Sequence, residues 1–336
     1  MANTSSESGG EFGIIEHYFA PLAKNTTGAF DLKDDAGLIS PPEGHDLVLT
    51  TDMIIAGVHY LESAAPRDIA YKALAVNISD LCAKGATPSV YLLSIALPGI
   101  PDPVWLEGLS EGFAEAQADF GCALLGGDTV STQGPAVFSI TAAGFVPSGR
   151  MVHRMGAKPG DHVYVTGTIG DAALGLILLR DDRQAETTNL SVEQTSFLHS
   201  RYWRPRPRIE AIEAILSHAN AAMDISDGLA GDFSKLCSAS RVGGKIDAAS
   251  MPLSDAARQM VKAEPKYLSD VINGGDDYEL LVTVPQNAQD QFEGDCRNSG
   301  ISVKGIGHIL KLNEGISVLG ADGEALELEK LSYAHF

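Results

Sequence analysis

Apolar and polar positions along the chain predict a nearly regular succession of strands and helices. Strands are expected where apolar residues run together or alternate with polar ones, and helices where apolar residues recur with a helical period. The predicted strands cover residues 46–55, 90–97, 122–125, 137–145, 162–166, 222–225, 280–284 and 301–309. The predicted helices cover residues 12–22, 67–84, 104–120, 171–180, 209–220 and 229–239, and the polar segment 181–193 is expected to be a loop.

The helix predicted at residues 67–84 has the clearest boundaries. A proline lies at its start and a glycine follows its end, which is the usual asymmetry of helix termini. Asn77, Asp80 and Lys84 fall on one stripe of this helix because they are spaced at i, i+3 and i+7. Asp80 can pair with Lys84 one turn away, or it can face a ligand together with other carboxylates. The pattern alone leaves both interpretations open.

Two domains of the α+β class are expected. A length of 336 residues exceeds that of one typical core, and a stretch rich in glycine and charge at residues 148–160 indicates a boundary. Strands and helices are mixed in both halves, which favours mixed sheets flanked by helices over a doubly wound parallel sheet. The expected division is a disordered tail at 1–10, an N-terminal domain at 11–149 and a C-terminal domain at 150–336.

The charge balance excludes several classes of partner. The chain carries 44 acidic and 24 basic side chains, a net charge of −20, which argues against binding to nucleic acid or to anionic membranes. No apolar run is long enough to span a bilayer, and the polar N-terminus lacks the apolar core of a signal peptide. The four cysteines show no metal-binding spacing. They are expected to be buried free thiols, in keeping with a cytoplasmic protein.

Aspartates at the ends of apolar segments are the strongest chemical signal in the sequence. Carboxylate and hydroxyl oxygens are hard ligands that suit Mg²⁺, and neighbouring glycines let backbone N–H groups approach a phosphate. We therefore expect a site where several Mg²⁺ ions hold the phosphates of a nucleotide. The motifs lie at residues 34–35, 50–52, 77–80, 126–128, 224–227 and 274–277.

Each of these motifs also has a purely structural explanation when it is considered alone. Aspartate and serine cap turns and helices, so Asp52, Asp128 and either Ser226 or Asp227 can be explained in that way. The pair Asp224 and Asp227 is harder to explain, because like charges close together are unfavourable unless a cation lies between them.

Other patterns are assigned structural roles. The segment 167–171 joins a strand to a helix but lacks the Gly-Lys-Ser/Thr of a Walker A loop. The basic stretch 201–208 looks like a nucleic-acid patch, yet in so acidic a chain a solvated connector or an interdomain contact is expected. His59, taken alone, is also expected to be structural.

In combination, these motifs resemble those of the thiamine-monophosphate kinase family, in the superfamily that includes aminoimidazole ribonucleotide synthetase. The resemblance runs in order from residue 10 to the C-terminal residues 333–336. The matching stretches are Gly10-Glu11-Phe12, Asp34-Asp35-Ala36, Thr51-Asp52-Met53, Gly57-Val58-His59, residues 70–81, Gly126-Gly127-Asp128-Thr129, residues 156–161, residues 224–229 and residues 275–280.

The resemblance implies an aminoimidazole ribonucleotide synthetase-like fold, a homodimer, and transfer of the γ-phosphoryl of ATP to thiamine monophosphate with Mg²⁺. It implies that Gly127, Asp128, Arg154 and Ser226 contact ATP, and that His59, Asp276 and Tyr333 contact thiamine monophosphate. The implied Mg²⁺ ligands are Asp35, Thr50, Thr51, Asp52, Asp80, Asp128, Asp224 and Asp227.

Two positions depart from the family pattern. Lys33 stands where the family usually has glycine, and Asp276 stands where it usually has glutamate, whose side chain is longer by one methylene. The alternatives that remain are another ATP-using enzyme of the superfamily and a non-catalytic ATP-binding module. Because a phosphate monoester has a second pKa of about 6, it is largely dianionic at neutral pH and needs no general base. Direct in-line transfer without a phosphoenzyme is therefore predicted.

Overall fold

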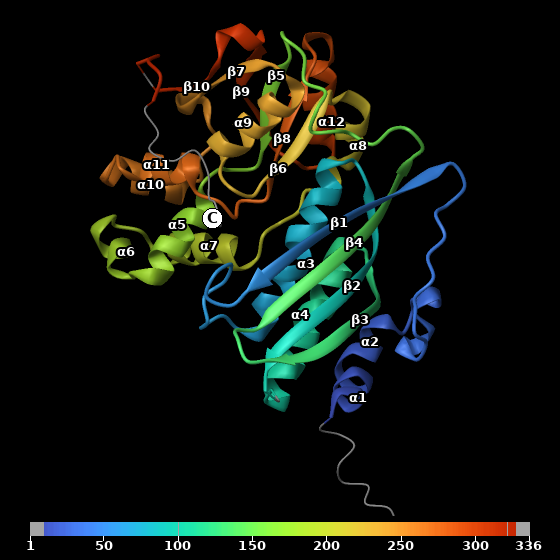
Figure 1. Cartoon of the computed structure of the whole chain (residues 1–336). Helices are drawn as coiled ribbons and strands as arrows, with labels where there is room; N and C mark the ends of the chain where they lie inside the picture. Colours follow the sequence, from blue (N-terminus) through green and yellow to red (C-terminus); the bar gives the residue numbers. More distant parts are fainter. Residues whose placement is uncertain (1–9, 100, 321, 327–336) are drawn as a thin grey trace, which may run out of the picture. The chain divides into compact units, whose positions relative to one another are not determined.

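The chain forms two compact units (Figure 1). The computed structural model describes residues 10–99, 101–320 and 322–326. The first unit comprises the chain up to Leu81 together with Ala86–Gly149, and the second comprises Cys82–Gly85 and the chain from Arg150 onward. Each unit holds one mixed sheet flanked by helices, so the predicted α+β class is confirmed.

The sheet of the first unit has four strands in the order β1-β4-β2-β3. β4 is antiparallel to β1 and β2, whereas β3 is parallel to β2. A parallel pair needs a crossover connection, which the helix between β2 and β3 supplies. The strands are β1 (His45–Ile55), β2 (Thr87–Pro98), β3 (Ala123–Thr132) and β4 (Val137–Pro147).

Helices α3 (Pro66–Ala83) and α4 (Pro103–Phe120) cover one face of this sheet (Figure 1). The Asp102 carboxylate accepts a hydrogen bond from the Val104 N–H at 3.2 Å, which caps α4, and Gly121 ends the helix with a φ of 66°. The predicted N-terminal helix is present as α1 (Glu11–Ile14), a π-helical turn (Ile15–Phe19) and α2 (Ala20–Ala23).

The sheet of the second unit has six strands in the order β10-β7-β9-β5-β8-β6. Among the described strands of this sheet, only β10 and β7 pair in parallel. The other neighbours are antiparallel, so this sheet is mixed as well. The strands are β5 (His162–Thr166), β6 (Ala221–Ile225), β7 (Gly243–Asp247), β8 (Glu279–Val284), β9 (Val303–Leu310) and β10 (Ile316–Leu319).

Helices pack on both faces of this second sheet. Successive side chains of a strand point to opposite faces, and β5 shows both environments. Val163 and Val165 belong to the main core cluster, whereas the Tyr164 ring packs edge-on against Phe292 of α12. The helices are α5 (Asp171–Arg180), α6 (Arg183–Thr187), α7 (Val192–Trp203), α8 (Ile212–His218), α9 (Leu229–Ser240), α10 (Asp255–Ala263), α11 (Tyr267–Asn273) and α12 (Gln289–Asn298).

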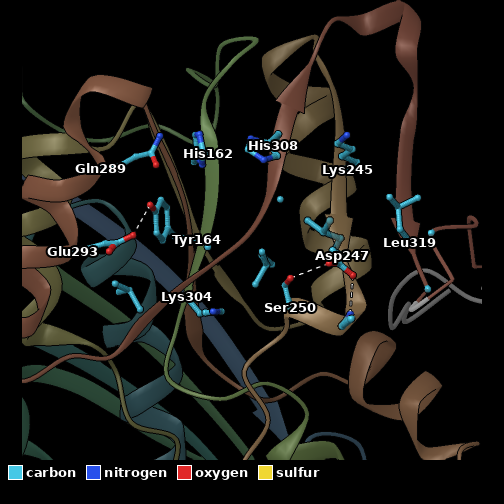
Figure 2. Close-up of a pocket in the computed structure, with 18 residues that line it drawn as sticks. His162, Tyr164, Lys245, Asp247, Ser250, Gln289, Glu293, Lys304, His308 and Leu319 are labelled. Carbon is cyan, nitrogen blue, oxygen red and sulfur yellow. Dashed lines mark hydrogen bonds between the residues drawn. The ribbon is translucent and has the colours of Figure 1, made fainter.

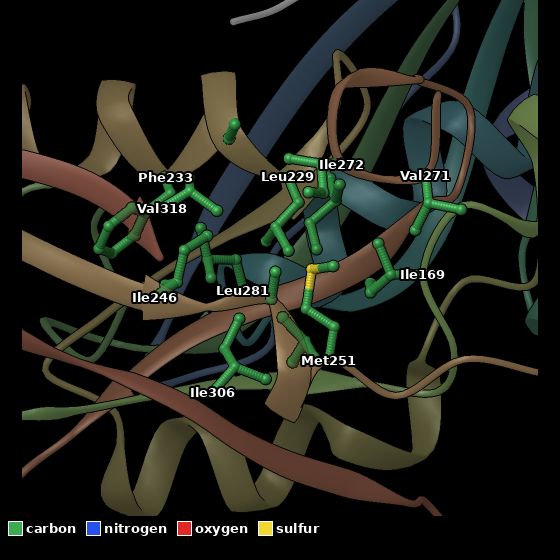
Figure 3. Packing of buried hydrophobic residues seen from close by; sticks show 14 of the residues in the cluster. Ile169, Leu229, Phe233, Ile246, Met251, Val271, Ile272, Leu281, Ile306 and Val318 are labelled. Carbon is green, nitrogen blue, oxygen red and sulfur yellow. The ribbon is translucent and has the colours of Figure 1, made fainter. Parts of the chain in front are cut away.

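The core of the second unit lies between α9 and the sheet (Figure 3). Phe233 and Leu229 of α9 meet Ile246 of β7 and Leu281 of β8, and all four side chains are fully buried. Burying such side chains stabilises the fold by about 1.5–3 kcal/mol each. This packing fixes the connection from β6 to α9, which carries the acidic motif at residues 224–227.

The end of α3 (Cys82 and Ala83) and the two residues that follow it belong to the second unit, although most of the helix lies in the first. The Lys84 ammonium donates to the Ala222 carbonyl oxygen at 2.8 Å, and the Val152 N–H donates to the Lys84 carbonyl oxygen at 3.1 Å. The Lys84 ammonium therefore bonds to a carbonyl of β6.

Three predicted features differ from the structure. The third strand was expected to end at Leu125, but β3 continues to Thr132 because it pairs with β2 along its whole length. The predicted loop at 181–193 contains α6 and the start of α7. The basic stretch 201–208 is not a solvated connector, because Arg201 lies in α7 and is only 4% exposed.

All four cysteines are buried free thiols, as predicted. Burial raises the pKa of Cys122, Cys237 and Cys296 to about 12, so these thiols stay protonated at neutral pH. Within the described ranges, no helix has both the length and the apolar character needed to cross a bilayer.

Candidate active site

Strand β1 and helix α3 bring several of the predicted residues together. The Thr50 hydroxyl donates to the Asp80 carboxylate at 2.5 Å, and the Asp52 N–H donates to the Asn77 side-chain oxygen at 2.9 Å. The buried Asn77 amide also donates to the Ala73 carbonyl at 3.1 Å, which fixes its orientation. Asn77 was placed on the right stripe of the helix from the sequence, but it was not counted among the site residues.

Thr51 points to the opposite face of the sheet from Thr50 and Asp52, because side chains alternate along a strand. Its hydroxyl donates to the Ile140 carbonyl at 3.0 Å and accepts from the Thr141 hydroxyl at 3.1 Å. The three consecutive residues therefore do not present their side-chain oxygens to one point.

A second set of acidic side chains lines a cavity of about 610 Å³ in the first unit. Asp34 and Asp35, from the segment before β1, lie on its wall together with Gly127 and Asp128. The glycine pair lies within β3 and not in a loop after it, with Gly127 opposite Leu93 of β2. The carboxylates of Asp35 and Asp128 are exposed to solvent. The fold thus brings two predicted ligands, far apart in sequence, to one cavity.

His59 lies in the turn after β1. Its Nδ1 atom accepts a hydrogen bond from the Ile55 N–H at 3.1 Å, so the proton of a neutral ring is on Nε2. This bond gives the ring a structural anchor while its other nitrogen remains a donor.

In the second unit, the turn from β6 to α9 is held by Asp232, which the sequence did not single out. Its carboxylate accepts from the N–H groups of Ser226 and Asp227 at 3.0 and 2.9 Å. The helix starts after Gly228 without a side-chain cap, so neither Ser226 nor Asp227 is its N-cap. Lys235 reaches back to Asp227 at 2.5 Å and to Asp232 at 2.8 Å.

The segment before β8 lies against this turn. The Asp276 N–H donates to the Ser226 carbonyl and the Tyr278 N–H donates to the Ile225 carbonyl, both at 2.9 Å. Asp276 and Tyr278 adopt left-handed backbone conformations, with φ of 72° and 51°. A predicted ATP contact and a predicted substrate contact are therefore adjacent in this unit.

Two buried carboxylates on either side of Tyr278 hold the segment in this conformation. The Asp277 carboxylate accepts from the N–H groups of Gly170 and Ala172 at 2.6 and 3.3 Å. Burial raises the pKa of Asp277 well above its usual value, and the nearby Asp171 adds to the effect. The loop 167–171 thus has a structural role, as expected, because its Gly170 N–H donates to Asp277.

Glu279 is the second of these carboxylates and the centre of a buried network. It accepts from Arg201 at 2.8 Å, from Arg208 at 2.6 Å and from the Thr166 hydroxyl at 2.7 Å. Arg201 also donates to the Asp277 carbonyl at 3.4 Å. Arg201 and Arg208 of the basic stretch therefore hold the acidic segment around Asp277 and Glu279 in place. No local pattern in the sequence indicates this contact.

Asp224 is the next-to-last residue of β6 and is 5% exposed. Arg154 is exposed, and its carbonyl accepts from the Ser240 hydroxyl at 3.3 Å. Tyr333 lies outside the described residues. In the part of the chain that the structure describes, no three acidic, histidine or cysteine side chains gather closely enough to hold a metal by themselves.

Comparison with known proteins connects this geometry to a family. A family model described as AIR synthase related protein, N-terminal domain, matches residues 33–146, and the corresponding C-terminal domain model matches residues 158–319. A thiamine-monophosphate kinase from Escherichia coli is 39% identical over 328 residues, which cover 97% of this chain and 98% of the relative. The chain belongs to the thiamine-monophosphate kinase family.

Solved structures of thiamine-monophosphate kinases share the fold. A crystal structure from Stenotrophomonas maltophilia superposes with a TM-score of 0.79 at 35% identity, covering 88% of this chain and 91% of the other. A structure named AaThiL, complexed with AMPPCP and TMP, superposes with a TM-score of 0.74 at 31% identity and covers 100% of both chains. The predicted aminoimidazole ribonucleotide synthetase-like fold is confirmed.

Proposed function

We propose that this chain transfers the γ-phosphoryl group of ATP to thiamine monophosphate, giving thiamine diphosphate and ADP. The observation that carries the proposal is the likeness, over the full length of both chains, to a structure that holds AMPPCP and TMP. Gly127, Asp128, Arg154 and Ser226 are the proposed ATP contacts. His59, Asp276 and Tyr333 are the proposed contacts of thiamine monophosphate.

The proposal includes Mg²⁺, and the oxygen donors present suit it. Mg²⁺ in phosphate-transfer sites is bound by one or two carboxylates together with substrate phosphates, so a ready-made cluster of three carboxylates is not required. When bound, it would neutralise charge that develops on the phosphates. The proposed ligands are Asp35, Thr50, Asp52, Asp80, Asp128, Asp224 and Asp227, with Thr51 limited to its main-chain oxygen.

The chain's own residues have a positioning role in this reaction. The acceptor phosphate is already largely dianionic at neutral pH, so no side chain has to remove a proton from it. The main obstacle is repulsion between two anions, because one unit-charge pair about 4 Å apart costs roughly 4 kcal/mol at an effective dielectric of 20. The guanidinium of Arg154 and the N–H groups near Gly127 would offset part of it. We expect direct in-line transfer without a phosphorylated enzyme.

The decisive experiment measures ADP release by the purified chain with ATP and Mg²⁺. Release is expected to depend on thiamine monophosphate and to be absent with thiamine or with a purine precursor. Release that depends on the purine precursor would favour the aminoimidazole ribonucleotide synthetase-like alternative. ATP binding without turnover on any acceptor would favour the non-catalytic module. A competent phosphoenzyme or ping-pong kinetics would contradict direct transfer.

Asp128→Asn tests the proposed ligand role at the shared cavity. It removes one negative charge with little change of shape, so turnover is expected to fall at least about a hundredfold, the scale of losing one electrostatic contact in a transition state. Asp182→Asn, which alters an exposed carboxylate before α6, is the matched control and should keep normal turnover. Unchanged turnover of Asp128→Asn at saturating Mg²⁺ would remove Asp128 from the site.

A homodimer and a cytoplasmic location complete the proposal. The buried free thiols support a reducing compartment. The uncovered face of the first sheet supports self-association, because it exposes Leu47, Leu49, Met53 and Leu92 to solvent.

A further inference from the structure

A polar pocket lies on the α12 face of the second sheet, within the second unit (Figure 2). Its volume is about 760 Å³. Pockets for small organic ligands typically measure about 300–1,000 Å³. The proposed function assigns none of the residues that line it.

Three basic side chains cross this pocket in one row. His308 of β9 pairs in register with His162 of β5 on one side and with Lys245 of β7 on the other. Residues paired in register point to the same face of a sheet, and Figure 2 shows the three side chains side by side along the upper part of the pocket. The two imidazole ring centroids are 4.3 Å apart.

The acidic groups of the pocket already have partners. The Asp247 carboxylate accepts from the Ala249 N–H and the Ser250 hydroxyl, both at 2.9 Å. The Glu293 carboxylate accepts from the Tyr164 hydroxyl at 2.8 Å. In the described part of the chain, neither carboxylate forms an ion pair with the basic row.

The basic row is therefore a set of cation-forming groups that have no ion-pair partner among the described residues, in a chain whose net charge is −20. Burial together with the neighbouring His162 and Lys245 lowers the pKa of His308 below its usual value. An anion beside His308 would oppose that effect, because it favours the charged form of the His308 ring.

We propose that this pocket binds a small phosphate monoester, with the phosphate on His162, His308 and Lys245. The pocket is much larger than a phosphate ion. Ser250 and Gln289 line its lower and left parts and can bond to hydroxyl groups of the ligand (Figure 2). A polyol or sugar phosphate fits this distribution of donors and acceptors.

The test uses the full-length protein and reads the imidazole nitrogen resonances of His162 and His308 by NMR, assigned with His162→Gln and His308→Gln. Inorganic phosphate and glycerol phosphate are titrated separately. Both resonances are expected to shift saturably, with tighter binding of glycerol phosphate. Tighter binding of inorganic phosphate would assign the site to the free ion and overturn the monoester.

Lys245→Gln is expected to weaken binding about tenfold, the effect of one charge-assisted contact of ~1.4 kcal/mol. Lys262→Gln, which alters an exposed lysine on α10, is the matched control and should not weaken it. Resonances that do not shift, or equal affinities in the two variants, would overturn the site. Both variants should retain ADP release with thiamine monophosphate, so failure here is distinguishable from failure of the proposed function.

Binding should strengthen as pH falls from about 8 to about 6, because ligand binding and histidine protonation favour each other. Inorganic sulfate is the probe for this pH titration, since its charge does not change over that range. The other charged groups around the row are Lys304 of β9, Asp247 of β7 and Glu293 of α12. Affinity that is independent of pH would overturn the role of the histidines.

Discussion

Gly127 is required by packing, a reason that the Gly-Gly-Asp motif does not indicate. A glycine beside an aspartate suggests backbone N–H groups open to a phosphate. In the structure, a Cβ added to Gly127 would lie 1.9 Å from the Leu93 carbonyl oxygen, a contact that a rigid strand cannot relieve. Glycine is thus required there by the close approach of β2 and β3, whatever binds nearby.

Gly127→Ala is therefore expected to lower the free energy of unfolding by about 1–3 kcal/mol, the cost of overpacking a well-packed region. Gly134→Ala is the control, because its added Cβ would be no closer than 3.6 Å to the Thr132 hydroxyl. Urea denaturation of both variants checks the prediction. Equal stability of the two would show that β2 and β3 can separate at little cost.

At this scale, the sequence predicts which chemical groups a site contains better than it predicts their partners. The oxygen-rich motifs were identified because residue type and local spacing carry that information. Arg201 was missed because its partner Glu279, 78 positions away, is fixed only when distant segments pack. Asp232 was missed for another reason: its partners are backbone N–H groups of a turn six and five positions earlier, and residue type alone does not indicate that contact. The opposite direction of Thr51 could have been predicted, since it follows from strand alternation alone.

At the scale of elements, the segment that carries Asp276 depends on two buried carboxyl groups. Asp277 and Glu279 lie on either side of Tyr278, which has a left-handed backbone conformation. Asp277 accepts from Gly170 in the loop 167–171, and Glu279 accepts from Arg201 of α7 and from Arg208 in the segment after α7. Losing one partner of such a buried network is costly, about 3–5 kcal/mol. The conformation of the proposed substrate contact is therefore set by side chains outside the site.

The raised pKa of Asp277 makes the stability of the folded state depend on pH in a predictable direction. The folded state binds this proton more tightly than the unfolded state, so stability falls as pH rises from about 3.9 through the folded pKa. Asp277→Asn cannot ionise and lacks this dependence. We expect the stability deficit of Asp277→Asn relative to the wild type to shrink as pH rises from about 4 to about 7. Urea denaturation across that range checks it, and a growing deficit would contradict it.

Most predicted elements show an apolar period, but β7, α10, α11, α12 and β10 were not predicted. The helix α10 was missed although Ala256, Ala257 and Met260 are buried at helical spacing. α6 buries none of its residues, so it leaves no apolar pattern to detect. α7 begins with a capping box between Ser191 and Gln194, a signal that was present in the sequence but not used. β3 was cut short because its second half is polar and is held by pairing with β2.

At the scale of the whole molecule, the open face of the first sheet has a testable role. Leu49 is 61% exposed near the middle of β1, on the face opposite α3 and α4. Leu49→Asp is expected to convert the proposed homodimer to a monomer, since a charge buried in an apolar interface is strongly unfavourable. Leu312→Asp is the control, because Leu312 is 65% exposed in the second unit. Sedimentation equilibrium measures the mass, and an unchanged dimer would move the interface elsewhere.

The segment Cys82–Gly85, which is the end of α3 and the two residues after it, belongs to the second unit and affects the order of folding during synthesis. Lys84 and its partner Ala222 are separated by 138 positions. At roughly 5–20 residues per second, a ribosome takes about 7–28 seconds to bridge that interval. The segment at the end of α3 therefore cannot complete its contacts until β6 has been synthesised. A fragment that starts at Arg150 would lack residues of its own unit, so cutting the chain between its two halves would not yield two complete folding units.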